Sequence, residues 1–271
     1  MGTDRALQDS LIRLLADAPF RDALMHVDEG VAYGGLAADQ VEAIRAGDLR
    51  RVDRFGKFLA RQYYHERLWH FHKYSRALAH WTGRSPDGLL LTPAFANLLP
   101  TIILGSRTTA RDLARLVQAY MADARHAPPY AADLVRYENA QLVAESGPRP
   151  PASAPPRARP QLATILNPDA SIQRFAFDLT AVFKPLLAFE ESGQHPDAPP
   201  EAPAADLTLV FVRSPRGRVT VLRWTDTIES LTAYLDGERP LSDAIDAASL
   251  PPRDGLEIAT ALLDAGVIIP A

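Results

Sequence analysis

The chain has 271 residues, of which 47% are hydrophobic, and this length suits two domains better than a single core. Its 29 Lys and Arg residues against 33 Asp and Glu residues give a net charge of −4, which excludes a general attraction to nucleic acid. The sequence contains no cysteine, which excludes disulfides, thiolate metal sites and a cysteine nucleophile. The N-terminal stretch has acids among its apolar residues and no apolar run is long enough to span a bilayer, so we expect a cytoplasmic protein without membrane contact.

Helical periodicity dominates the first half of the chain. Apolar residues recur at helical spacing from Asp4 to Ala18, and Pro19 is expected to end that helix. A second helix is expected from Ala37 to Gly47, where glycine is a typical stop. Further helices are predicted from Thr92 to Pro100, from Ser106 to Ala124 and from Pro128 to Ala144. The sequence therefore predicts an all-α domain over residues 1–146.

The stretch from Phe55 to Trp81 is the richest in aromatic residues and predicts one long helix packed on two sides. Between its two apolar stripes lies a basic ridge of Lys57, Arg61, His65, His72, Arg76 and His80. A solvated face and a partner-facing surface both explain such a ridge. A third hypothesis is a helical enzyme with its own metal ion, but the spacing of the histidines on the helix opposes it. His65 and His72 lie seven residues apart, about 10 Å along a helix axis, too far for one ion. We therefore expect no metal in this chain.

Two proline-rich stretches interrupt the pattern. Residues 147–160, GPRPPASAPPRARP, hold too little apolar surface for a core and too much proline for helix or sheet, which predicts a semi-rigid linker. Residues 193–206, GQHPDAPPEAPAAD, predict a long loop inserted in the domain that follows.

The second half of the chain changes character. Residues 171–182 alternate and favour a strand, whereas residues 207–213 and 218–224 predict a hairpin around Ser214–Gly217. Short helices ending near Leu235, Ala248 and Ala265 are expected next, before a closing strand at Val267–Ile269. Strands followed by three helices with tight turns are typical of a winged-helix-like module, predicted here over residues 161–271. The expected fold class is therefore α+β, an N-terminal all-α helical domain followed by this small module.

The sequence carries none of the common catalytic signatures: it has no GxSxG, GxGxxG, P-loop, HExxH or CxxC motif. We therefore expect a binding protein without catalytic residues. One interpretation of the module is a winged helix that reads DNA in a transcription regulator. Its third predicted helix carries Asp254, Glu257 and Asp264 against Arg253, which is the wrong sign for phosphate.

A second interpretation is the capture of an extended peptide at a free sheet edge beside a helix. The candidate peptide-binding residues are Val219, Val221 and Arg223 on the hairpin, with Leu256, Thr260 and Leu263 on the third helix. The alternative for each apolar member of this set is that it fills the core.

Several segments of the chain resemble one protein family. The run PYAADLVRYENA at residues 129–140 is similar to the P-x-L-x-DLARLEWA signature of the HvfC-like family, whose label is DNA binding. Further matches lie at residues 64–83, 166–168, 175–183, 209–213 and 234–244. The resemblance covers nearly the whole chain from about Arg51 onward. Within the family, the chain looks most like the TglI-like partner subunit of the 3-thiaglutamate pathway.

This resemblance implies a non-catalytic partner subunit of a multinuclear non-haem iron enzyme that modifies a ribosomal precursor peptide. In related systems, those of methanobactin and 3-thiaglutamate, a winged-helix recognition element binds the peptide while an iron-dependent TIM-barrel subunit remodels a cysteine. By resemblance, the chain forms a heterodimer with such an enzyme, presents a peptide Cys for removal of its β-carbon, and leaves the iron to the enzyme. We expect the helical domain to dock the enzyme through Arg61, His65, His72, Arg76 and His80. The alternative function is a winged-helix DNA-binding transcription regulator.

Overall fold

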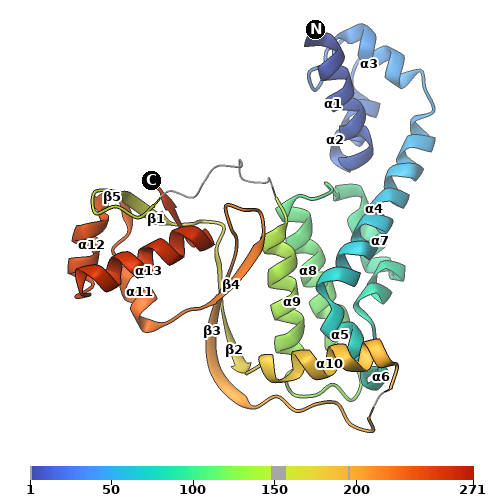
Figure 1. Cartoon of the computed structure of the whole chain (residues 1–271). Helices are drawn as coiled ribbons and strands as arrows, with labels where there is room; N and C mark the ends of the chain where they lie inside the picture. Colours follow the sequence, from blue (N-terminus) through green and yellow to red (C-terminus); the bar gives the residue numbers. More distant parts are fainter. Residues whose placement is uncertain (1, 148–156, 195) are drawn as a thin grey trace. The chain divides into compact units, whose positions relative to one another are not determined.

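The computed structural model of the chain describes residues 2–147, 157–194 and 196–271 (Figure 1). This described part is mixed α+β, as the sequence predicts, with two small antiparallel sheets. The chain divides into two compact units, Met1–Arg125 and His126–Ala271. The linker predicted at residues 147–160 falls mostly outside the described residues. No described helix combines the length and the apolar character that crossing a bilayer requires.

The described residues of the first unit form helices and the loops that join them. Its helices are α1 (Gly2–Ala16), α2 (Ala18–His26), α3 (Ala38–Arg45), α4 (Leu49–Phe71), α5 (Lys73–Ala77), α6 (Ala79–Thr82), α7 (Pro93–Leu98) and α8 (Arg107–Ala122), with the 3-10 turns η1 (Pro86–Leu91) and η2 (Leu99–Thr101) on either side of α7. Asp17, Asp48 and Ser106 begin helices α2, α4 and α8 because each side chain accepts a hydrogen bond from a backbone N–H in the first turn. Pro19 does not end a helix as predicted. It lies in the first turn of α2, where proline costs no hydrogen bond.

Helix α4 carries one buried stripe, not two. The stripe consists of Ala60, Tyr64, Leu68 and Phe71. On the other flank, Phe55, Phe58 and Trp69 remain 49%, 59% and 52% exposed. The predicted packing on two sides is therefore wrong, and an aromatic face of α4 meets solvent.

The single helix predicted to run to Trp81 is interrupted at His72. This residue has φ −101° and ψ 35°, outside helical geometry, and it separates α4 from α5 and α6. His72 is 0% exposed, so one member of the predicted basic ridge lies in the core. The continuous ridge does not form because the phase of a helix is lost where the helix breaks.

The second unit combines two sheets with helices. Its elements are α9 (Ala131–Glu145), β1 (Ala163–Leu166), β2 (Ser171–Phe177), α10 (Thr180–Ser192), β3 (Ala204–Arg213), β4 (Val219–Arg223), α11 (Asp226–Thr232), β5 (Asp236–Pro240), α12 (Leu241–Ala247), α13 (Pro252–Ala265) and β6 (Ile268–Pro270). The strand orders are β2-β3-β4 and β5-β1-β6. The predicted hairpin is confirmed, since β3 and β4 pair on either side of Ser214–Gly217. Helix α10 and strands β1 and β5 were not predicted, and β3 begins inside the predicted loop insertion.

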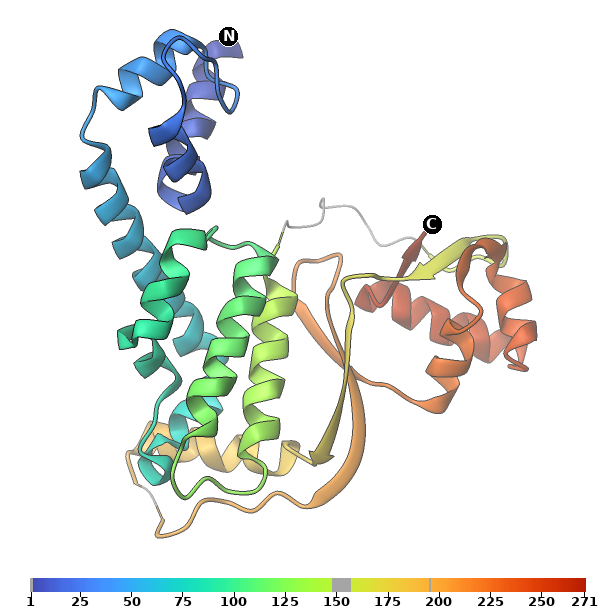
Figure 2. The ribbon, with the colours of Figure 1, turned by 180° about the vertical axis from the view of Figure 1, so that it is seen from behind.

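Helix α9 belongs to the second unit, whereas the sequence assigns it to a helical domain that ends at residue 146. It lies along one face of the β2-β3-β4 sheet (Figures 1 and 2). The Tyr137 ring of α9 lies 6.2 Å from Phe175, 5.3 Å from Phe211 and, in α10, 5.1 Å from Phe183. The two boundaries differ because a helical period is a local signal that does not say which layer the helix covers.

The other face of this sheet is covered by the C-terminal helices. Side chains alternate along a strand, so Val210 and Val212 point away from Phe211 and from α9. Their buried cluster contains Leu231 of α11, Leu241 and Ile245 of α12, and Leu262 and Leu263 of α13. The central strand β3 is paired on both sides, so the two edges of the sheet are where its backbone can meet another chain.

Candidate interaction surfaces

The outer edge of β2 is occupied by two side chains of α9. The Asp133 carboxylate accepts a hydrogen bond from the Ala176 N–H at 2.6 Å. The Arg136 guanidinium donates to the Arg174 carbonyl at 2.8 Å. Asp133 and Arg136 also form an ion pair with an N–O distance of 2.6 Å. These contacts use backbone groups that an added strand would need, so this side of the sheet is closed there.

The outer edge of β4 is open. The register of β4 against β3 is regular, and the Trp224 N–H donates to the Thr208 carbonyl at 2.8 Å just beyond it. Since hydrogen bonding alternates along an antiparallel strand, the even-numbered residues of β4 bond to β3 and the odd-numbered residues point outward. The outward residues are Val219, Val221 and Arg223. Among the described residues, no strand pairs with their N–H and C=O groups.

The side chains of these outward residues share one face of the sheet. Val221 lies opposite Phe211, so its side chain is on the face that α9 covers. Val219 and Arg223 are each two positions away and share that face. Val219 and Val221 are half-buried and Arg223 is exposed. The backbone of these residues is therefore available while the two valine side chains are partly packed.

The candidate residues of α13 lie on the opposite face of the sheet. Leu263 is 1% exposed and belongs to the buried cluster, so it fills the core. Leu256 packs partly buried against the same cluster. Thr260 is exposed and its hydroxyl donates to the Leu256 carbonyl at 2.7 Å. The structure therefore does not bring the two predicted sets into one groove.

An open groove runs between α1 and the start of α4 in the first unit. It has a volume of about 780 Å³ and is lined by Leu15, Asp48, Arg51, Val52, Arg54 and Phe55. Leu11 and Ile12 of α1 are 48% and 64% exposed. The Phe55 and Phe58 rings stack at 6.3 Å on α4. Exposed apolar residues on these two helices are the kind of surface that marks a protein–protein contact.

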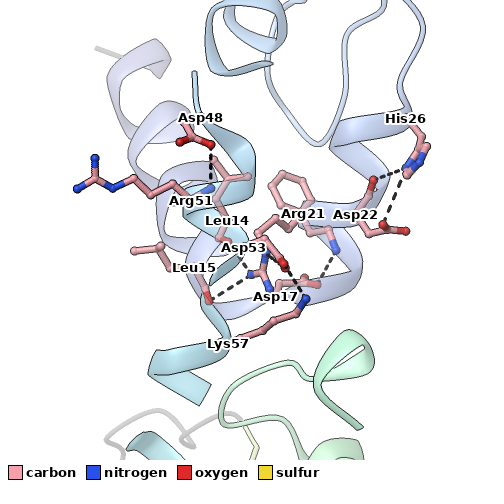
Figure 3. A network of polar contacts seen from close by, with 11 residues as sticks. Leu14, Leu15, Asp17, Arg21, Asp22, His26, Asp48, Arg51, Asp53 and Lys57 are labelled. Carbon is pink, nitrogen blue, oxygen red and sulfur yellow. Dashed lines mark hydrogen bonds and ion pairs between the residues drawn. The ribbon is translucent and has the colours of Figure 1, made fainter. Parts of the chain in front are cut away.

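A partly buried ionic network holds α1 and α2 against α4 (Figure 3). The Arg21 guanidinium, in a residue only 2% exposed, donates to the Leu14 carbonyl at 2.8 Å and to the Asp53 carboxylate at 3.3 Å. Asp53 also accepts from the Lys57 ammonium at 2.7 Å. Burial raises the pKa of Asp53, but Lys57 and Arg21 together outweigh it and hold the pKa below its ordinary value. A Cβ at Gly56 would lie 2.7 Å from an Arg21 nitrogen, so a larger residue there would displace the guanidinium from these contacts.

The residues predicted to dock an enzyme occupy different environments. Arg61 donates to the Leu90 carbonyl at 2.8 Å. His65 and Arg76 both lie against the Trp69 ring, His65 stacked at 6.0 Å and Arg76 at 3.5 Å. His80 is exposed, with its ring 5.4 Å from that of Trp81. His72 is fully buried and cannot contact a partner, because the helix break directs it inward.

Asp133 and Arg136, which close the β2 edge, were not singled out from the sequence. An acidic residue is common in the first turn of a helix, where the helix dipole favours it. An Arg three residues later commonly forms an ion pair with it on the helix surface. Both residues fall in the run at 129–140 that resembles the family signature, which is the only signal that points to them.

Over residues 2–147, 157–194 and 196–271, no three His, Asp or Glu side chains gather in a way that could hold a metal ion. Comparison of the chain with protein-family models and with curated proteins finds no match.

Proposed function

We propose that this chain is a non-catalytic partner subunit that binds a ribosomal precursor peptide and presents its Cys to an iron-dependent oxidative enzyme. The observation that carries the proposal is the asymmetry of the β2-β3-β4 sheet. Asp133 and Arg136 close one edge, and the other edge offers outward N–H and C=O groups. An extended peptide that adds to β4 as a further strand gains main-chain hydrogen bonds without displacing any part of the described chain.

The helices that follow the hairpin support a winged-helix-like recognition element. Helices α11, α12 and α13 pack on one face of the sheet that ends in β4. In this proposal the backbone of β4 binds the peptide, with Val219, Val221 and Arg223 as the residues that contact it. Leu256 and Thr260 of α13 lie on the opposite side of the sheet from the side chains of Val219, Val221 and Arg223, so they do not contact the peptide. Leu263 fills the core.

The first unit is proposed to dock the enzyme in a cytoplasmic heterodimer. Its support is the exposed aromatic face of α4. Phe55 lines the groove, Phe58 stacks on Phe55, and Arg76 covers the exposed Trp69 further along the helix. Aromatic and arginine side chains are enriched among residues that dominate binding energy in interfaces. The iron and the removal of the Cys β-carbon, as in 3-thiaglutamate formation, are assigned to the enzyme by resemblance alone.

The test of peptide binding compares two substitutions at Val221. Val221→Pro removes an outward N–H but no hydrogen bond to β3, and proline is tolerated in edge strands for this reason. Val221→Ala removes the side chain and keeps the N–H. Calorimetry with short Cys-containing peptides encoded beside the gene should show binding that Val221→Pro weakens about tenfold or more, and that Val221→Ala largely retains.

A second measurement tests the heterodimer. The purified chain and the iron enzyme encoded with it should co-elute in size-exclusion chromatography at micromolar concentration. Absence of both peptide binding and co-elution would remove the proposed function. Binding of duplex DNA at low salt in place of peptide would favour the transcription regulator instead.

A further inference from the structure

Three arginines lie along the open edge of β4 and its turn without a partner in the described chain. Arg216, Arg218 and Arg223 are all exposed. None of the three side chains forms an ion pair, a hydrogen bond or a ring contact with a described residue. By contrast, Arg213 at the same hairpin is engaged, since its guanidinium donates to the Gly147 carbonyl at 3.1 Å and lies 3.7 Å from Glu145. The hairpin therefore concentrates positive charge beside its free backbone.

Neighbouring carboxylates do not neutralise this charge. Asp206 of the central strand β3 is bound to Arg174 of β2. Asp226 is the nearest acid that follows β4 in sequence, and it occupies the first turn of α11, where a carboxylate is favoured by the helix dipole. The acids of α13 include Glu257, which pairs with Arg253 at 3.2 Å.

We infer that the β4 edge selects an extended peptide segment that carries carboxylates, an inference that rests on the proposed function. A strand added to β4 places its side chains directly opposite those of β4, and opposite charges in such cross-strand pairs attract. Arg218 and Arg223 are five positions apart, which is about 17 Å along a strand. The segment that fits best has two Asp or Glu residues five positions apart, with neutral residues between them opposite Val219 and Val221.

The same charges exclude a second copy of this chain as the occupant. Pairing of two β4 edges would bring two sets of these arginines onto one ladder, and charged residues on edge strands prevent such self-association. An acidic strand meets no such repulsion. Each exposed pair is expected to contribute about two- to fivefold in affinity, less at high salt.

The experiment uses the full chain and three labelled synthetic ten-residue peptides that differ only at two positions five apart: Glu, Gln or Lys. Fluorescence anisotropy at low salt should give about tenfold tighter binding for the Glu peptide than for the Gln peptide, with no detectable binding of the Lys peptide. Added salt should reduce the difference. The double variant Arg218→Glu with Arg223→Glu should prefer the Lys peptide. Arg253→Glu, which reverses another exposed arginine of the same unit, should leave the order unchanged.

Different outcomes overturn different claims. Equal binding of all three peptides that Val221→Pro still abolishes overturns the charge inference and leaves strand capture in place. Preference for the Glu peptide that Val221→Pro does not affect also overturns the inference, because the acids then bind away from the β4 edge. If no peptide binds at millimolar concentration, strand capture at β4 is itself refuted. Far-UV circular dichroism of each variant checks that the fold is retained.

Discussion

The closure of the β2 edge by Asp133 can be tested by removing its carboxylate. In Asp133→Ala, the Ala176 N–H loses an acceptor at 2.6 Å and Arg136 loses its ion-pair partner. Hydrogen bonds to charged groups contribute about 1.5–3 kcal/mol each. The Arg136 side chain is 36% exposed, so its half of the contact is screened and counts for less than about 1 kcal/mol. We expect Asp133→Ala to lower the free energy of unfolding of the second unit by about 2–3 kcal/mol.

Asp133→Asn separates the two contributions of the carboxylate. Its amide oxygen can still accept from the Ala176 N–H, so the loss should be about 1 kcal/mol. Asp206→Ala is the matched control, because Asp206 also pairs with an arginine of this unit but its side chain is 67% exposed. Removing an exposed partner of this kind should change the free energy of unfolding much less than Asp133→Ala does, because solvent screens the ion pair.

The assay combines urea unfolding with hydrogen exchange at the Ala176 amide. Exchange there should accelerate in Asp133→Ala and stay close to the parent rate in Asp206→Ala. An open β2 edge should also make Asp133→Ala self-associate as its concentration rises, which light scattering detects. If Asp133→Ala matched Asp206→Ala in all three measurements, the carboxylate would not be what closes this edge.

Three further outcomes concern the first unit. Gly56→Ala should lower the free energy of unfolding by about 2 kcal/mol, because the lost Arg21 contacts outweigh a helix-propensity gain of about 1 kcal/mol. In an Arg21→Ala background the same change should stabilise the unit, and urea unfolding of the parent and the three variants tests this. The pKa of Asp53 in the folded chain is below its ordinary value of 3.8. Its contribution to the free energy of unfolding is therefore present above pH 4 and is lost as the pH falls through the folded pKa. The free energies of unfolding measured at pH 7 and pH 3 should differ less in Asp53→Asn than in the parent. Phe58→Asp should change the free energy of unfolding by no more than about 0.5 kcal/mol yet weaken enzyme binding at least about tenfold. Val31→Asp, at another exposed apolar residue of this unit, should leave enzyme binding unchanged. Equal effects of the two substitutions on the titrated affinity would place the enzyme contact elsewhere.

The parts of the fold that could be predicted from the sequence are those with local signals. Capping residues such as Ser106, and a turn with Gly217 at φ 78°, act within a few residues of the structure they specify. Helix α10 was missed because it contains Pro185, and proline inside a helix costs about 3 kcal/mol unless tertiary packing compensates. The helix break at His72 has no glycine or proline beside it, so the sequence contains no local signal for it. Only burial against the rest of the unit distinguishes it, which periodicity cannot show.

The candidate site shows the same division between local and distant causes. Val219, Val221 and Arg223 could be chosen from the sequence because every second residue of a predicted strand shares one direction. Which edge of the sheet is free could not be chosen, because that depends on Asp133 reaching the Ala176 N–H from 43 residues away. Helix α9 covers one face of the β2-β3-β4 sheet and also closes its β2 edge, so a further strand can be added only at β4. Since α9 and not the hairpin closes the β2 edge, Asp133→Ala should allow β2 to accept a peptide as well, while every residue of β4 stays the same.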